Sequence, residues 1–182
     1  MGSPTLITVK LPTVIVLASG RGERFIASGG KTHKLRALLA GKPLLQHTLD
    51  AVIASGLRWH LEDAGHPGMG DSIAAAVRAT AGAAGWLILP GDLPLVQPQT
   101  LRHLATVWPE QDVVVPVFRG QRGHPVRFAA RFGAALMALT GDRGAGQIAR
   151  EAGAAELVLT DAGCVTDIDT VQDLQRAAAA VV

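Results

Sequence analysis

Two short stretches of this sequence carry residues that could bind phosphates and a metal ion. The first is a glycine turn with two arginines, Arg21 and Arg24, directly after the apolar run 13–18. Backbone N–H groups and cationic side chains can converge on phosphates at such a turn, so a nucleotide is the expected ligand. The second stretch places Asp92 just after the apolar run 86–89. A carboxylate at the carboxyl end of a buried strand is well placed to hold Mg²⁺.

The loop 19–42 is rich in glycine and in basic residues, and its length favours a functional loop. Besides the two arginines it contains Lys31 and Lys34. Two known nucleotide-binding signatures fail here. Phe25 stands where a P-loop needs its first glycine and also where a dinucleotide fingerprint needs its third. From these residues alone, a solvated basic loop and a phosphate site are about equally well supported.

The composition bounds what the chain can be. With 182 residues, 48% apolar and 18% charged, it can bury a full core, and we expect one domain over residues 1–182 with an N-terminal arm at 1–12. The net charge of +2 and the scattered basic residues predict no nucleic-acid partner. Because no apolar segment is long enough for a membrane span and 1–11 lacks a secretion signal, no membrane partner and a cytoplasmic location are expected. The single cysteine, Cys164, excludes an internal disulfide and is expected to be a buried filler.

The alternation of strand and helix patterns predicts an α/β fold with a largely parallel sheet. Strands are expected at 13–18, 58–62, 86–89, 112–117, 125–128 and 156–159. Helices are expected from Pro43 to a stop at Gly56, from a cap at Asp71 or Ser72 to about 80, at 99–107, 132–139 and 145–151, and from a capping box at Thr170 to Asp173.

Eight segments, taken in order, resemble the MobA-like nucleotidyltransferase domain. They are 17–20, 24–25, 34–35, 41–45, 68–72, 91–96, 123–126 and 167–170. The pattern is most similar to the molybdenum cofactor cytidylyltransferases and runs from about Thr13 to Ala177. This resemblance implies a three-layer, Rossmann-like nucleotide-diphospho-sugar transferase fold. The interval between Gly56 and Gly68 has room for little more than one strand, so we expect a sheet one strand-helix unit smaller than usual.

The resemblance also implies a reaction in which a phosphate of the acceptor attacks the α-phosphorus of an NTP and expels pyrophosphate. Such a reaction needs no covalent nucleophile from the protein, but it needs in-line positioning, a bridging metal and cations that absorb charge. The cytidylyl pattern implies CTP as donor, a molybdopterin-type cofactor as acceptor, Mg²⁺ as metal and a molybdenum hydroxylase as client. A guanylyltransferase, a sugar-phosphate nucleotidyltransferase and a non-catalytic maturation factor that binds nucleotide or cofactor stay open as alternatives.

The resemblance assigns the charged residues to roles. Arg24 and Lys34 are expected to bind the triphosphate and Asp92 to hold the metal, and these three form the expected catalytic set. Asp169 or Asp167 is expected to complete the metal shell. Because the two aspartates alternate along one extended segment, only one is expected to touch the metal, and Asp169 is preferred.

The remaining assignments concern the nucleotide and the acceptor. His124 and Arg143 are expected to face the acceptor, and His66 has no assigned role. The glycines beside Met69 are expected to let the backbone approach a base or ribose. The residues expected to bind the nucleotide are Leu17, Ala18, Ser19, Gly20, Arg21, Gly22, Lys31, Gly68, Met69, Gly70 and Ser72, and Lys31 could take the place of Lys34.

Overall fold

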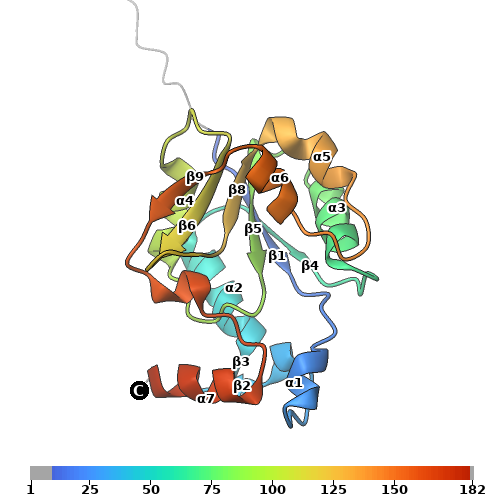
Figure 1. Cartoon of the computed structure of the whole chain (residues 1–182), viewed down its shortest axis with the longest axis vertical. Coiled ribbons are helices and arrows are strands. Elements are labelled where there is room, and N and C mark those ends of the chain that lie inside the picture. The colour runs from blue at the N-terminus through green and yellow to red at the C-terminus, as the bar shows by residue number, and fades with distance from the viewer. Residues whose placement is uncertain (1–9, 181–182) are drawn as a thin grey trace, which may run out of the picture.

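The computed structural model of the protein describes residues 10–180 (Figure 1), so most of the expected arm at 1–12 lies outside the described residues. A seven-stranded sheet has the order β4-β1-β5-β8-β6-β7, and β9 pairs with β6. Its strands are β1 (Thr13–Leu17), β4 (Trp59–Glu62), β5 (Gly85–Pro90), β6 (Val113–Phe118), β7 (Gln121–Arg122), β8 (Val126–Ala129) and β9 (Ala155–Val158).

The sheet is mostly parallel, as the sequence predicts. Strand β1 runs parallel to both β4 and β5, and β9 runs parallel to β6. Strand β8 is antiparallel to its neighbours β5 and β6. The carboxyl ends of β1, β4 and β5 therefore meet at one edge of the sheet, which is where open α/β sheets bind ligands.

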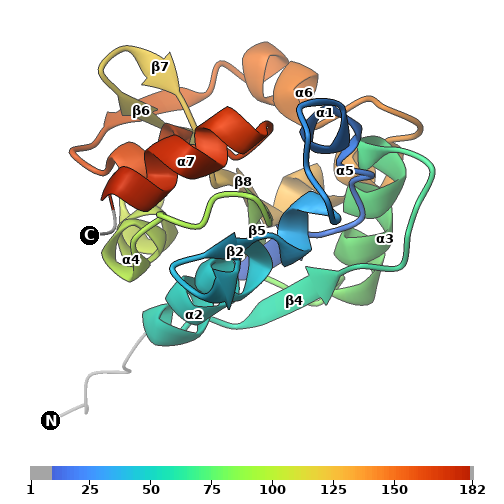
Figure 2. The ribbon, with the colours of Figure 1, turned by 90° about the horizontal axis from the view of Figure 1, so that it is seen from below.

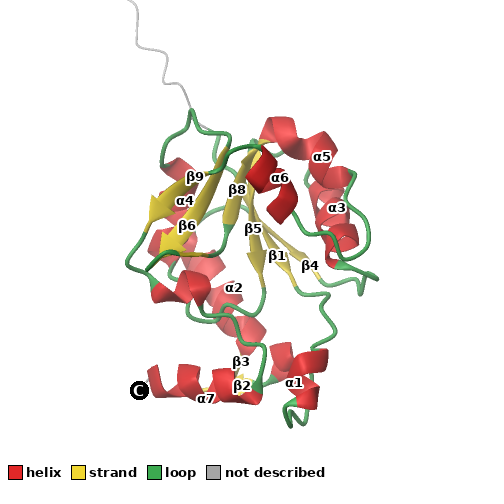
Figure 3. Cartoon of the chain, in the orientation of Figure 1, coloured by secondary structure: helices red, strands yellow, loops and turns green. Residues whose placement is uncertain are grey.

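Helices cover both faces of the sheet, which gives the expected three layers (Figure 3). On one face, Val14 and Val16 of β1 pack in a cluster with residues of α2 (Leu44–Ser55) and α4 (Pro98–Thr106). On the other face, Ile15 packs with residues of α3 (Met69–Ala79), α5 (Gly133–Met137) and α6 (Gly146–Glu151). Burial on both faces explains why β1 is apolar at every position.

A small layer of chain lies below the carboxyl edge of the sheet, and Figure 2 views it from that side. The loop 19–42 is more structured than its composition predicts, because it contains α1 (Glu23–Ala27), the 3₁₀ turn η1 (Lys34–Arg36) and β2 (Leu38–Leu39), which pairs with β3 (Lys42–Pro43). Phe25 and Leu39 are buried there in a separate cluster with Ala177 of α7 (Val171–Ala180).

Two helix starts test the capping predictions. The capping box is confirmed, because the Asp173 carboxylate accepts from the Thr170 N–H (2.7 Å) and the Thr170 hydroxyl accepts from the Asp173 N–H (3.1 Å). The predicted cap of α3 is wrong, since Gly68 precedes its first residue, Met69. The Asp71 carboxylate instead accepts from the Gly141 N–H, and the Ser72 hydroxyl donates back to the Gly68 carbonyl.

Three further expectations agree with the structure. Gly56 ends α2 in the left-handed conformation, with φ of 71°. A single strand, β4, stands between α2 and α3. Cys164 is fully buried. Within the described part of the chain, no helix has the length and apolar character needed to cross a membrane.

Candidate functional site

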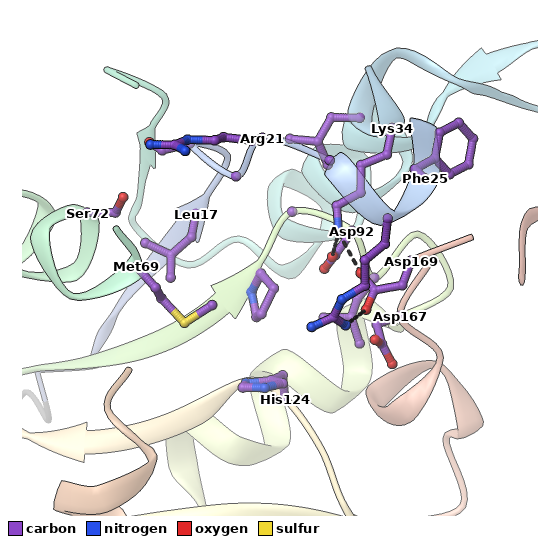
Figure 4. A pocket seen from close by; sticks show the side chains of 18 of the residues that line it. Leu17, Arg21, Phe25, Lys34, Met69, Ser72, Asp92, His124, Asp167 and Asp169 are labelled. Carbon is purple, nitrogen blue, oxygen red and sulfur yellow. Dashed lines mark hydrogen bonds and ion pairs between the residues drawn. The ribbon is translucent and has the colours of Figure 1, made fainter. Parts of the chain in front are cut away.

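A cavity of about 710 Å³ opens at the carboxyl edge of the sheet, and we call it the edge cavity (Figure 4). Its walls come from segments that are distant in sequence. The lining residues are Leu17, 19–25, 34–35, 66–69, Ser72, 90–93, 121–124, Asp142, 164–165, Asp167 and Asp169. The volume is within the range of small-molecule sites.

Most of the residues predicted for a nucleotide site line the edge cavity. They are Leu17, Ser19, Gly20, Arg21, Gly22, Arg24, Lys34, Gly68, Met69, Ser72, Asp92, His124, Asp167 and Asp169. Among the described residues, four predicted ones do not line it: Ala18, Lys31, Gly70 and Arg143. The Ala18 N–H donates to the Glu62 carbonyl at 2.8 Å, while Lys31 and Arg143 are exposed elsewhere on the surface.

Lys34 is the centre of an ion cluster at one end of the edge cavity. Its Nζ lies 2.6 Å from Oδ2 of Asp92 and 2.8 Å from Oδ1 of Asp169. Arg24 Nη1 lies 2.7 Å from Oδ2 of Asp169, as the dashed lines in Figure 4 mark. The side chains of Lys34 and Asp92 are only 13% and 15% exposed, so this is a largely desolvated pair. We call these four residues the Lys34 cluster.

The charges of the Lys34 cluster are fixed by its own contacts. Burial alone would lower the pKa of Lys34, but the carboxylates of Asp92 and Asp169 outweigh it and raise that pKa. Burial alone would raise the pKa of Asp169, but Lys34 and Arg24 outweigh it and lower that pKa. The ammonium therefore stays protonated and the carboxylate stays ionised around neutral pH.

The chemistry of the acidic groups fits a divalent cation. Oδ1 of Asp92 is buried and has no hydrogen-bond partner among the described residues, although a buried carboxylate oxygen normally has one. Asp167 lines the same wall, and burial together with the nearby Asp92 and Asp169 carboxylates raises its pKa. Carboxyl groups that line one cavity are the ligand type that a hard cation such as Mg²⁺ prefers. In the described chain no group of three or more His, Cys, Asp and Glu side chains forms a metal site as it stands, and Lys34 engages two of these carboxylates.

Close backbone packing positions the wall opposite the glycine turn. A Cβ on Gly123 would lie 2.1 Å from the Cys164 carbonyl oxygen, so only glycine lets these segments meet. The His124 N–H donates to the same carbonyl at 2.8 Å. Burial lowers the pKa of His124 despite the nearby Asp92, and its Nδ1 is buried with no partner in residues 10–180. A neutral imidazole thus lies on this wall.

The glycines beside Met69 also allow close packing of the backbone. A Cβ on Gly68 would lie 2.2 Å from the backbone of Gly141, and one on Gly70 would lie 2.6 Å from the Arg143 carbonyl oxygen. In the structure these glycines let the start of α3 pack against the loop 140–143. Asp142 of this loop lines the edge cavity, whereas the predicted Arg143 beside it does not.

The two ends of the edge cavity differ in chemistry. In Figure 4, Leu17, Met69 and Ser72 lie together and apart from the Lys34 cluster. The Met69 side chain is large and apolar yet 52% exposed, which leaves an apolar surface facing the cavity. One end can therefore neutralise anionic groups, and the other offers apolar surface and backbone groups.

Several lining residues were missed by the sequence reasoning. They are Glu23, His66, Gln121, Arg122 and Asp142. His33 was also missed. Its Nε2 donates to the Gly20 carbonyl at 2.6 Å and its Nδ1 accepts from the Leu35 N–H, so it ties the glycine turn to the Lys34 segment. The only available signals were that His33 directly precedes Lys34 and that Arg122 stands two residues before His124.

Comparisons with known proteins agree with the fold. The family model described as MobA-like NTP transferase domain matches residues 50–157. The bifunctional protein GlmU of Desulfitobacterium hafniense is 29% identical over 114 residues, which cover 51% of this chain and 24% of that protein. The chain thus matches about a quarter of the length of this curated relative.

Solved structures with the same fold span nearly the whole chain. Rv0371c from Mycobacterium tuberculosis superposes with a TM-score of 0.79 at 24% identity, covering 95% of this chain and 100% of that one. It has also been solved in complex with manganese. Molybdopterin-guanine dinucleotide biosynthesis protein A from Archaeoglobus fulgidus superposes with a TM-score of 0.69 at 20% identity, covering 93% and 98%. Because the family model matches more than half of its length, this chain belongs to the MobA-like NTP transferase domain family.

Proposed function

We propose that this protein is a Mg²⁺-dependent nucleotidyltransferase that transfers CMP from CTP to the phosphate of a molybdopterin-type cofactor and releases pyrophosphate. The observation that carries the proposal is the Lys34 cluster at one end of a 710 Å³ cavity. In this proposal residues 1–182 act as one catalytic domain, and a molybdenum hydroxylase receives the product.

The cations of the cluster have a direct use in phosphoryl transfer. Negative charge builds on the oxygens of the α-phosphate and on the leaving pyrophosphate, and fixed positive groups lower the energy of that state. Lys34 and Arg24 supply such groups, and the N–H groups of the turn 20–22 add backbone donors. The Lys34 ammonium has three N–H donors and uses two of them on Asp92 and Asp169, so the third can donate to a phosphate oxygen.

The carboxylates have a separate use. Asp92 would hold Mg²⁺ through the Oδ1 that has no partner among the described residues, with Asp169 or Asp167 as a second ligand. The ion, when bound, would neutralise phosphate oxygens and fix their orientation. The manganese complex of the similarly folded Rv0371c supports the use of a divalent cation.

The acceptor is proposed to bind at the wall formed by 121–124. Arg122 and the neutral His124 lie on this wall and could contact a phosphate and its proton. The molybdopterin acceptor is supported by the sequence resemblance and by the printed name of the Archaeoglobus fulgidus protein. That name also makes a guanylyltransferase the second candidate, because it specifies guanine.

A pyrophosphate assay tests the proposal. The purified protein is incubated with Mg²⁺, isolated molybdopterin cofactor and each of CTP, GTP, UTP and ATP in turn, and pyrophosphate release is followed. We expect the fastest release with CTP, and none after EDTA treatment. Preference for GTP would favour the second candidate. Capture of the cofactor at 1:1 with no release from any NTP would contradict an enzyme and favour a maturation factor.

A further inference from the structure

A buried carboxylate holds a histidine on the wall of the edge cavity. Oε1 of Glu62 lies 2.9 Å from Nε2 of His66, and the His66 side chain lines the cavity. Glu62 is the last residue of β4 and pairs in register with Leu17 of β1. Its side chain is only 8% exposed, so the carboxylate acts from behind the wall.

The state of the Glu62 carboxylate determines which atom of His66 remains available. Burial alone would raise the pKa of Glu62, but hydrogen bonds from two histidines and the Ala64 N–H outweigh it and lower that pKa. An ionised carboxylate only accepts hydrogen bonds, so His66 donates through Nε2–H. In the neutral ring Nδ1 is then a hydrogen-bond acceptor, and it is the ring nitrogen not used by Glu62.

The position of His66 places this acceptor at the end of the edge cavity that lacks the Lys34 cluster. His66 immediately precedes Pro67, Gly68 and Met69, and all four line the cavity. Met69 in turn lies beside Leu17 and Ser72, apart from Lys34 and Asp92 (Figure 4). If the triphosphate binds at the Lys34 cluster, the base of the same nucleotide extends toward this apolar end.

We propose that His66 is a specificity-determining residue whose Nδ1 accepts a hydrogen bond from an exocyclic amino group of the base, and that Glu62 is its positioning residue. This inference rests on the proposed nucleotidyltransferase function. An acceptor at this position selects cytosine over uracil, because cytosine carries an amino group where uracil carries a carbonyl oxygen. The carbonyl oxygen of uracil would face Nδ1 of His66, which is also an acceptor, and neither atom would then have a donor. Polar sites reject close analogues in this way.

The Glu62 carboxylate also provides a matched control. Nε2 of His60 lies 3.3 Å from the other oxygen, Oε2, but among the described residues His60 does not line the edge cavity. The two histidines thus share the buried carboxylate, and only one can reach a nucleotide. The same substitution is therefore made at His60 and at His66. Both variants change a hydrogen bond to Glu62, but only the variant at His66 changes a side chain that can contact the base.

The experiment measures the dissociation constants of CTP and UTP by titration calorimetry with Mg²⁺ present. The variants are His66→Gln, His66→Ala and His60→Gln, each checked by thermal unfolding. The amide of glutamine can replace the Nε2–H donor to Glu62 but has no atom equivalent to Nδ1. We expect His66→Gln and His66→Ala to reduce the CTP over UTP preference about tenfold, through weaker CTP binding, and His60→Gln to keep it.

The outcomes separate this inference from the proposed function. A wild-type protein that binds CTP no more tightly than UTP overturns the role of His66. The same holds if His66→Gln retains the wild-type preference, because His66 would then serve only to support the wall. Pyrophosphate release is measured separately on the same samples. Selective CTP binding without release counts against the proposed function but leaves base recognition by His66 intact.

Discussion

The Nζ atom of Lys34 lies 2.6 Å from Oδ2 of Asp92, although the two residues are 58 positions apart in the chain. A second carboxylate, that of Asp169, lies 2.8 Å from the same ammonium. One monovalent cation therefore stands between two carboxylates that suit a divalent ion. The ammonium occupies Oδ2 of Asp92 and Oδ1 of Asp169 and offsets the negative charge that these carboxylates offer a metal, whereas Oδ1 of Asp92 has no partner among the described residues.

Replacing Lys34 with methionine should therefore strengthen metal binding while it weakens catalysis. Without the ammonium, Asp92 and Asp169 are left as close like charges, which favours a divalent ion. We expect nucleotide-free Mn²⁺ binding, followed by electron paramagnetic resonance, to tighten about tenfold. Lys42→Met, which removes a surface pair with Asp50, is the control and should not change Mn²⁺ affinity. Equal affinities for wild type and Lys34→Met would show that the ammonium does not weaken metal binding at these carboxylates.

Replacing Asp92 with asparagine should stop turnover and leave the fold intact. The amide keeps the size of the side chain but removes the charge that would hold Mg²⁺, so we expect pyrophosphate release to fall about a hundredfold or more. The thermal midpoint should stay within a few degrees, because the amide oxygen can still accept from Lys34 and Asp169 keeps the ammonium paired. Asp112→Asn, which affects a surface pair with Arg131, serves as the control. Full activity of the Asp92 variant would exclude it as a metal ligand.

Gly68 should tolerate no side chain. An alanine Cβ there would lie 2.2 Å from the Gly141 carbonyl, and the backbones of both segments would have to separate. We expect Gly68→Ala to lower the free energy of unfolding by about 1–3 kcal/mol, measured by urea denaturation. A Cβ on Gly82 meets no atom within 4 Å, so Gly82→Ala should be neutral or slightly stabilising. Equal stabilities for the two variants would contradict the close approach of α3 to the loop 140–143.

The Cys164 thiol should be unreactive in the folded protein. Its ionisation should also lower the free energy of unfolding at alkaline pH. Burial is the main cause that raises the pKa of its thiol from 9.0 to about 11. As the pH rises, the thiol of the unfolded chain loses its proton before the buried thiol of the folded protein does. The stabilisation that the neutral thiol gives to the folded state is therefore fully present below pH 9 and is lost as the pH rises toward 11.

Two measurements test the Cys164 prediction. A disulfide reagent at pH 8 should label the thiol only after unfolding in urea. Between pH 9 and 11 the free energy of unfolding of wild type should fall more steeply than that of Cys164→Ala. Rapid labelling of the native protein would show that the thiol is accessible.

Local patterns in the sequence predicted much of the fold, and the family resemblance pointed to the members of the Lys34 cluster. The runs that form β1 and β5 are apolar at nearly every position because both faces of the sheet are covered, and this pattern is unambiguous. The capping box before α7 is a purely local signal, and it was confirmed. The position of Asp92 after a buried strand was enough to place it at the carboxyl edge of the sheet.

Features that depend on distant contacts were not predictable in this way. Helix α3 begins at Met69, where the Gly70 N–H donates to the Gly141 carbonyl at 2.8 Å, whereas the local cap signals at Asp71 and Ser72 pointed three or four residues later than the observed cap, Gly68. Nothing in the 125–128 stretch indicates that β8 runs antiparallel between β5 and β6. The pairing of Glu62 with His66 also escaped notice, because charged residues are rarely buried and the sequence does not say when one is.

The Arg24 to Asp169 pair joins residues 145 positions apart, and the N–H of Val171 donates to the hydroxyl of Ser28 at 2.9 Å. During translation, the basic turn therefore leaves the ribosome long before its second acidic partner has been made. The Lys34 cluster is therefore complete only once segments from both parts of the chain have folded together.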